Sequence, residues 1–291
     1  MTYANKIYIG EPGYLQLLKD VCARGDRRSN RTGIDTVALF GAQLRFYLDE
    51  GFPLFTTKKV WWKGVAVELD WMLRGESSIA HLLQHDVHIW DAWAKASYRP
   101  ELGLPDGDIG PGYGVQWRQW AKCYRNGDDY ITDSIDQIEQ IVDKLRHHRD
   151  DRRIILSAWN VGDIDKMKLP PCHYAAQFLV DSHNNLTCIV SLRSWDLFLG
   201  GPFNVAQYSL LTHLLAHVSG LHAHEVIFNG ADAHVYVNHF EQVSAQVSRK
   251  PRPLPKIMID PSLEEIDDFN FEMATIQSYD PHPAIKGDVA V

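Results

Sequence analysis

The chain has 291 residues, of which 45% are hydrophobic and 11% aromatic, and its formal net charge is −8 at pH 7. This length and composition are enough for a sizeable core, as one large domain or two small ones. The acidic balance argues against general binding to nucleic acids or anionic membranes, where a basic surface supplies the affinity. An anionic ligand would need a local cluster of arginines.

Membrane and secretory segments are not evident in the sequence. No apolar run approaches the roughly 18 residues of a membrane span, and the N-terminus lacks the apolar stretch of a secretory signal. The cysteines form no CxxC pair and fit neither a disulfide scaffold nor a zinc ribbon; they are Cys22, Cys123, Cys172 and Cys188. We therefore expect a soluble, cytoplasmic protein with reduced cysteines.

The first half of the chain predicts two amphipathic helices separated by strands. Helical spacing of apolar residues covers 12–24, and strand-like segments follow from Thr36 to Phe46. A second helix is predicted over 63–74, because its apolar residues fall on one stripe and a glycine follows it. Glu68 lies at the edge of that stripe.

The second half alternates further helices and strands. Residues 97–114 are rich in Gly, Pro and Asp and indicate an irregular loop. A helix is predicted over 131–146, a strand over 152–159, a hairpin over 175–194 and a long helix over 202–220. No repeat or linker interrupts these elements, and a single α+β domain is the simplest arrangement.

Cys172 lies in the segment "LPPCHYAAQF", directly after two prolines and before His173. The prolines stiffen the backbone that carries the thiol. Such a cysteine can be a nucleophile or a small buried apolar residue. The segment alone leaves both interpretations open.

Histidines at helical spacing favour packing over metal binding. His213 and His217 in "HLLAH" have the spacing of two zinc ligands, but Leu214 stands where a catalytic glutamate would be needed. We expect histidines on a core-facing or interface helix and predict no metal.

Several arginines of the sequence occur in clusters, and such clusters are typical of solvent-exposed surface. Arg193 is different. It lies within the apolar hairpin, where an unpaired guanidinium is costly. A phosphate would be a suitable partner.

Glu68 could be a general acid or base, because a nearly buried carboxyl group beside Trp90 and Trp93 would have a raised pKa. Aromatic pairs, however, more often serve packing than ligand binding.

Long motifs in one order resemble the thymidylate synthase family, folate-dependent enzymes that methylate dUMP. They are "NRTG", "GFPLFTTKK", "IWDAW", "GPGYGVQWR", "DDRRIILSAWN", "LPPCH", "FLGGPFN", "DAHVYVNH", "PRPLPK" and "YDPHPAIK". The resemblance runs nearly end to end and implies one catalytic domain over residues 1–291. It also implies a large mixed β-sheet flanked by helices, with one sheet face forming the interface of a homodimer.

By this resemblance Cys172 is the nucleophile that adds to carbon 6 of the uracil ring. Carbon 5 then attacks the methylene of the co-substrate 5,10-methylenetetrahydrofolate, and the product is dTMP. Arg193 would lie near both the sulfur and the substrate phosphate and favour the thiolate. Glu68 would manage protons through a water network, and Tyr113 and His173 would line the site.

The resemblance also assigns binding residues. Arg31, Arg193 and Ser194 would bind the phosphate, with Arg152 and Arg153 supplied by the other subunit; Asn204 would pair with the uracil edge, and His234 and Tyr236 would hold the ribose hydroxyl. The folate would contact Lys58, Ile89, Trp90, Trp93, Asp196, Leu199, Gly200, Phe203 and the terminal Val291. Asp196 also counts among the catalytic residues, and no metal, membrane or nucleic acid is expected.

Four residues depart from the usual family pattern: Ser191, Leu192, Trp195 and Gly201. They border the predicted nucleotide and folate sites and resemble the pyrimidine nucleotide hydroxymethylases, in which water replaces the folate hydride. A dUMP hydroxymethylase is therefore the alternative enzyme. A non-catalytic nucleotide- or RNA-binding relative is more remote, because the residues matching the nucleophile and its neighbours are retained.

Overall fold

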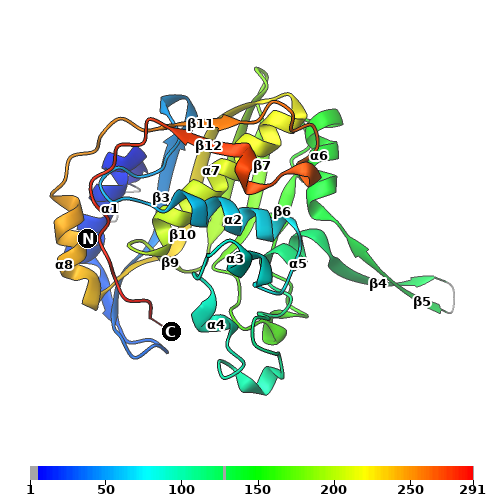
Figure 1. Cartoon of the computed structure of the whole chain (residues 1–291), viewed down its shortest axis with the longest axis horizontal. Coiled ribbons are helices and arrows are strands. Elements are labelled where there is room, and N and C mark those ends of the chain that lie inside the picture. The colour runs from blue at the N-terminus through cyan, green and yellow to red at the C-terminus, as the bar shows by residue number, and fades with distance from the viewer. Residues whose placement is uncertain (1–5, 127–128, 291) are drawn as a thin grey trace.

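A mixed eight-stranded β-sheet forms the centre of the computed structural model, which describes residues 6–126 and 129–290 (Figure 1). The strand order is β1-β3-β10-β8-β7-β6, with β2 paired to β3 and β9 paired to β10. The strands are β1 (Ile7–Ile9), β2 (Asp26–Arg28), β3 (Thr36–Tyr47), β6 (Ile155–Ser157), β7 (His173–Val180), β8 (Asn185–Leu192), β9 (Trp195–Asp196) and β10 (His222–Tyr236). The predicted α+β fold with a large mixed sheet is confirmed.

Helices and two small hairpins complete the fold. The α-helices are α1 (Gly10–Arg24), α2 (Trp62–Leu73), α3 (Ala80–Gln84), α4 (Asp91–Ala94), α5 (Tyr113–Arg118), α6 (Gln137–His147), α7 (Gly200–Ser219) and α8 (Phe240–Val247). The 3₁₀ helices are η1 (Leu48–Glu50), η2 (Pro100–Leu102), η3 (Ile164–Lys166), η4 (Val237–His239), η5 (Ile266–Asp268) and η6 (Phe271–Met273). The hairpins are β4 (Trp120–Asn126) with β5 (Asp129–Ile135), and β11 (Lys256–Ile259) with β12 (Ala274–Gln277).

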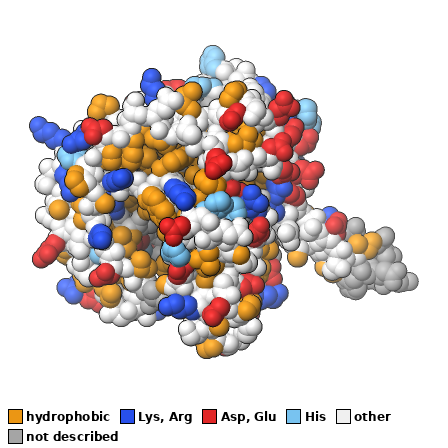
Figure 2. Space-filling view, in the orientation of Figure 1, with side chains coloured by type: hydrophobic (Ala, Val, Ile, Leu, Met, Phe, Trp, Pro, Cys, Tyr) orange, Lys and Arg blue, Asp and Glu red, His pale blue; other side chains and the backbone are white. Residues whose placement is uncertain are grey.

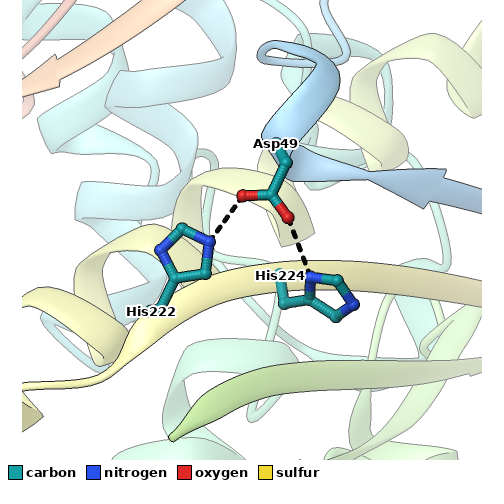
Figure 3. A group of neighbouring side chains, drawn as sticks. All are labelled: Asp49, His222 and His224. Atoms are coloured by element: carbon teal, nitrogen blue, oxygen red, sulfur yellow. Dashed lines mark hydrogen bonds and ion pairs between the residues drawn. The ribbon is translucent and has the colours of Figure 1, made fainter. Parts of the chain in front are cut away.

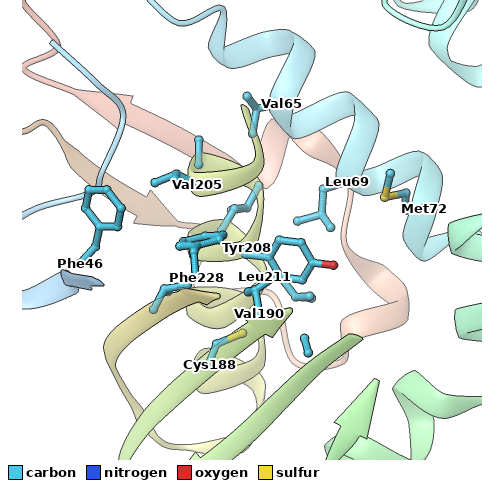
Figure 4. Packing of buried hydrophobic residues seen from close by; sticks show 14 of the residues in the cluster. Phe46, Val65, Leu69, Met72, Cys188, Val190, Val205, Tyr208, Leu211 and Phe228 are labelled. Carbon is cyan, nitrogen blue, oxygen red and sulfur yellow. The ribbon is translucent and has the colours of Figure 1, made fainter. Parts of the chain in front are cut away.

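The core lies between the sheet and helices α2 and α7 (Figure 4). Helix α7 buries residues on all sides, as expected of a helix that is apolar all round. Pro202 lies in its first turn, where no N–H is needed, and Gly220 ends it with a φ of +62°. Tyr208 of α7 packs beside Leu69 of α2 and Phe228 of β10 (Figure 4). These contacts fix the elements that carry the candidate site.

One predicted helix begins later than the sequence pattern indicated. Residues 131–146 were expected to be helical, but Asp129–Ile135 form β5 and only Gln137–His147 form α6. The Asp136 side chain accepts a hydrogen bond from the N–H of Glu139 at 3.0 Å and caps α6 at that point. The preceding residues pair with β4 in a hairpin that projects from the body of the molecule (Figures 1 and 2).

Two other predicted segments have different extents. The strand expected over 152–159 is limited to Ile155–Ser157. The expected loop over 97–114 contains η2 and the beginning of α5.

Among the described residues, no helix has both the length and the apolar character needed to cross a membrane.

Candidate active site

A cavity of about 1150 Å³ opens where the end of β8, the beginning of β7 and the beginning of α7 meet. Of the residues predicted for the site, seventeen line it: Arg31, Glu68, Ile89, Trp90, Trp93, Tyr113, Cys172, His173, Arg193, Ser194, Asp196, Leu199, Gly200, Phe203, Asn204, His234 and Tyr236. Residues far apart in the sequence are thus gathered in one cavity, and their individual roles stay predictions.

Arg193 and the two prolines position Cys172. The guanidinium donates to the carbonyl oxygens of Pro171 (2.9 Å) and Pro170 (2.8 Å), and its Nη2 lies 3.9 Å from the Cys172 Sγ. It also lies 5.7 Å from the ring of Trp159. Prolines lack an N–H but keep the carbonyl acceptor, so Arg193 anchors the stiff segment before the thiol. The thiol therefore has a fixed position beside a cation.

Burial raises the pKa of the Cys172 thiol above its usual range, and the positive charge of Arg193 opposes this shift only in part. The nearby Asp196 carboxylate also raises it. The sequence led us to expect that Arg193 would favour the thiolate, and it acts in that direction. The thiol nevertheless predominates at neutral pH without ligand, so nucleophilic attack has to be coupled to loss of its proton.

Glu68 of α2 faces the cavity and accepts two hydrogen bonds. Trp90 Nε1 donates to its Oε1 at 2.7 Å, and Gln207 Nε2 donates to its Oε2 at 2.9 Å. Burial raises the pKa of Glu68 to about 7, although both donors lower it. A carboxyl group with this pKa can both donate and accept a proton at neutral pH.

Tyr113 and His173 support the nucleophile's backbone. The Tyr113 hydroxyl accepts the backbone N–H of Cys172 at 2.8 Å, and its ring lies 4.4 Å from that of His173. His173 Nδ1 pairs with the Tyr208 hydroxyl at 2.8 Å, and burial lowers the pKa of His173 to about 3. His173 is therefore neutral at physiological pH.

Gly114 allows the close approach of α5, which carries Tyr113, to α2. A Cβ at Gly114 would lie 2.3 Å from the Met72 backbone oxygen.

The first turn of α7 places polar groups at the cavity wall. The Asp196 carboxylate accepts the N–H groups of Phe198 (3.0 Å) and Leu199 (3.2 Å) just before the helix. The Asn204 side chain forms no hydrogen bond to another described residue, although it lines the cavity. Its amide is free to donate and to accept toward a ligand.

His234 also lines the cavity and is held there by Asp232. Burial lowers the pKa of His234, but its 2.9 Å pairing of Nδ1 with Asp232 Oδ1 and the charge of Asp196 outweigh burial, so the pKa is raised. Arg28 pairs with the same Asp232 carboxylate. Asp232 and Arg28 were not predicted as site residues, although Asp232 belongs to the "DAHVYVNH" motif.

Two cavity arginines are available for an anion. Arg31 and Arg193 line the cavity, and neither forms an ion pair with a carboxylate of the described residues. Arg193 uses its N–H groups on carbonyl oxygens instead. Arg152 and Arg153 are exposed outside the cavity wall, and Arg153 pairs with Asp151 at 2.8 Å. The cavity thus contains two of the four predicted phosphate-binding arginines.

Aromatic residues form the wall next to Glu68. The Trp90 ring lies 5.7 Å from that of Trp93 and 5.9 Å from that of Tyr113. The Trp93 Nε1 is buried without a hydrogen-bond partner among the described residues. Trp90 is buried, donates to Glu68 and lines the cavity with Trp93. Packing therefore accounts for Trp90, and a role of the pair in binding a ligand stays a prediction.

Lys58 and the C-terminal segment differ in their relation to the cavity. Lys58 is buried, donates to the Phe198 carbonyl oxygen and is not among the lining residues. Burial lowers the pKa of Lys58 to about 8, against the opposing charge of Asp196. The Asp288 carbonyl pairs with His239 Nε2 at 3.0 Å, and Val289 and Ala290 line the cavity. Val291 lies outside the described residues.

Trp195 fills the space beside Gly201. The indole is 1% exposed and stacks on Phe228 at 5.7 Å. A Cβ at Gly201 would lie 3.3 Å from Trp195 Nε1, and one at Gly230 would lie 2.7 Å from Trp195 Cε3. The two glycines therefore accommodate the large indole. Gly201 therefore leaves no open gap beside the indole.

Gln207 is the principal site residue that the sequence analysis missed. It is a polar residue within the apolar helix α7 and is 2% exposed. A buried polar side chain requires a partner, and that requirement was the signal available in the sequence. Of the two helical histidines, His213 is half-buried and its ring packs against Phe52, whereas His217 is exposed.

A family comparison agrees with this geometry. The model of the family described as Thymidylate synthase matches residues 12–291, which is nearly the whole chain.

Proposed function

The chain belongs to the thymidylate synthase family, and on this premise we propose that it converts dUMP to dTMP with 5,10-methylenetetrahydrofolate as donor of carbon and hydride. The family supports folate-dependent one-carbon transfer to a pyrimidine nucleotide as the general activity. The placement of Cys172, Arg193 and Glu68 in one cavity with a free Asn204 amide supports the nucleotide chemistry, and the packing of Trp195 beside Gly201 carries the choice of hydride over water. Product identification by mass spectrometry tests it.

The proposed reaction begins with addition of the Cys172 sulfur to carbon 6 of the uracil ring. The thiol proton leaves as the carbon–sulfur bond forms, because the thiol predominates in the free protein. Arg31 and Arg193, with Ser194, hold the phosphate as charge-assisted hydrogen-bond partners. His234 and Tyr236 hold the ribose. Glu68 then exchanges protons with the ring through water.

The folate occupies the aromatic side of the cavity. Carbon 5 bonds to the methylene carbon and loses its proton, and the bond from that carbon to the folate nitrogen breaks. Hydride from the folate then completes the methyl group as the Cys172 sulfur leaves carbon 6. Ile89, Trp90, Trp93, Leu199, Gly200 and Phe203 line this side. Lys58 donates to the Phe198 carbonyl oxygen, and Asp196 orders the turn before α7; both would contact the folate from there. The segment ending in Val291 closes over the complex and excludes water.

Hydride transfer is favoured over water attack by the packing around Trp195. A hydroxymethylase needs a gap that admits water beside the exocyclic methylene intermediate, and a glycine at position 201 is the substitution that would leave one. The Trp195 indole occupies that space. Ser191 and Leu192 belong to β8, where Leu192 is 1% exposed and points into the core. These substitutions therefore support no channel for water.

We further propose a homodimer in which Arg152 and Arg153 reach the phosphate of the neighbouring site. Their exposure outside their own cavity supports this arrangement. On the sheet face opposite α7, β8 presents half-buried residues of mixed type: Asn185, Thr187, Ile189 and Ser191. This face would form the interface.

Mixing two inactive variants should restore activity if the sites are shared. Arg152→Glu chains lack the donated arginine, and Cys172→Ala chains lack the nucleophile. A heterodimer has one site with both defects and one site with neither, so random exchange should restore about one quarter of wild-type activity per site. Heterodimers without recovered activity would place Arg152 in its own subunit's site.

Asn204→Asp should weaken discrimination against dCMP. The amide can present an acceptor and a donor to the uracil edge, whereas a carboxyl group and its water network can serve a cytosine edge. We expect the ratio of kcat/KM for dUMP over dCMP to fall by about 10-fold or more. Ser194→Ala serves as a control, because loss of a phosphate contact should affect both nucleotides equally. An unchanged ratio would remove the base-reading role of Asn204.

A further inference from the structure

An aspartate and two histidines form a cluster that no part of the proposed reaction uses (Figure 3). The Nε2 of His222 lies 2.5 Å from Asp49 Oδ1, and the Nδ1 of His224 lies 2.9 Å from Asp49 Oδ2. One potential ligand atom from each residue lies within 4.8 Å of the others. We propose that Asp49, His222 and His224 bind one Zn²⁺ ion.

The backbone fixes the three residues in this arrangement. His222 and His224 belong to β10, and a register shift in its pairing with β8 occurs between Ala223 and Glu225, at His224. Such irregularities reorient a side chain. Asp49 lies in η1, just beyond Tyr47, which pairs with Glu225 at the end of the β3–β10 ladder. The sheet itself therefore brings residues 173 positions apart into contact.

The donor set suits zinc. Two imidazole nitrogens and one carboxylate oxygen are common Zn²⁺ ligands, and a water completes a four-coordinate site. Ligand bonds of about 2.0–2.2 Å separate the donor atoms of a tetrahedral site by about 3.3 Å. The present contacts have to open by less than about 1 Å. The side chains of Asp49 and His222 are 49% and 57% exposed, which permits this movement and the entry of an ion.

The surrounding charges also allow a cation. Glu225, the next residue of β10, lies 3.5 Å from Arg45 and offsets the charge of that arginine. Glu50 follows Asp49 and adds a further negative charge in η1. The cluster is therefore a locally acidic position on the surface.

The cluster lies far from the candidate active site. His222 pairs with Asn185 at one end of β8, whereas Arg193 follows Leu192 at the other. Seven residues of extended strand span roughly 23 Å. None of the three residues lines the active-site cavity. The ion would tie η1 to β10 and stabilise the fold without taking part in the proposed reaction.

Zinc binding to the full chain tests this proposal. Equilibrium dialysis against buffered Zn²⁺, followed by elemental analysis, should show one bound ion per chain. Asp49→Asn, His222→Asn and His224→Asn should each weaken binding by more than about 100-fold, since even loss of an outer-shell partner costs about 10–100-fold. His183→Asn is the matched control, because His183 is an exposed histidine in the β7–β8 turn, and it should bind as the wild type does.

Two further readouts separate this site from cysteine ligation and from misfolding. X-ray absorption should show nitrogen and oxygen at about 2.0–2.1 Å and no sulfur shell near 2.3 Å. Zn²⁺ should raise the Tm of the wild type and of His183→Asn but not of the cluster variants, whose Tm in chelator should lie within about 2–4 °C of the wild type because they lose only exposed pairs. Absence of bound zinc in the wild type, equal binding by the variants, or a sulfur shell would overturn the proposal.

Discussion

Cys172→Ala should lower turnover of dUMP by at least about 10⁴-fold, the scale on which loss of a catalytic nucleophile acts. The variant keeps the arginines and the Asn204 amide of the cavity but lacks the sulfur that bonds to carbon 6. Binding of dUMP should therefore persist with a Kd of the same order. Steady-state kinetics and calorimetric titration of dUMP measure the two effects separately.

Cys123→Ala is the control for this experiment. Cys123 is an exposed cysteine of β4 and is absent from the cavity wall, so its removal should leave kcat and KM unchanged. Mass spectrometry of denatured ternary complexes should find a covalent nucleotide adduct in Cys123→Ala and none in Cys172→Ala. Appreciable turnover by purified Cys172→Ala would contradict covalent catalysis.

Glu68→Gln should lower kcat by about 10²–10⁴-fold, the usual contribution of a general acid or base. The amide retains the shape of the carboxylate but cannot exchange a proton near neutral pH. In the wild type, a limb of the pH profile of kcat/KM should have an apparent pKa near the value of about 7 that burial gives Glu68. This limb should disappear in Glu68→Gln.

Gln207→Leu provides the complementary measurement. The Gln207 N–H stabilises the ionised form of Glu68 at 2.9 Å and lowers its pKa. Removing this donor should raise the pKa, so the same limb should move to higher pH instead of disappearing. Gln207→Glu would add a second acid and is not suitable for the comparison. If this limb of the pH profile stays at the same pH in both variants, it reports the titration of a group other than Glu68.

Apolar periodicity predicted the elements that form the core, because α1, α2 and the β7–β8 hairpin have uniform patterns. It failed at residues 131–135, where Ile131 and Ile135 fit a helical stripe as well as they fit β5. These residues form a strand because they pair with β4, and because the hydrogen bond accepted by Asp136 sets the beginning of α6 after them. Strand β10 was missed because Gly230 and several polar residues interrupt its alternation, while its long pairing with β3 supplies the missing stabilisation.

Much of the candidate site could be predicted from motifs, because most of the motifs contribute between one and four residues to the cavity wall. Contacts between motifs could not be predicted, since they depend on packing across the fold. Gln207 reaches Glu68 from a different helix, and Trp195 occupies the space left by Gly201 and Gly230. The cluster of Asp49 with His222 and His224 likewise depends on the alignment of β3 with β10.

The products formed from dUMP and 5,10-methylenetetrahydrofolate test the central claim most directly. If hydride reaches the exocyclic methylene, the products are dTMP and dihydrofolate, and near-ultraviolet absorbance rises as dihydrofolate accumulates. Mass spectrometry should then find dTMP in equal amount to dihydrofolate. Hydroxymethyl-dUMP with tetrahydrofolate, and no rise in absorbance, would contradict the account and identify a hydroxymethylase.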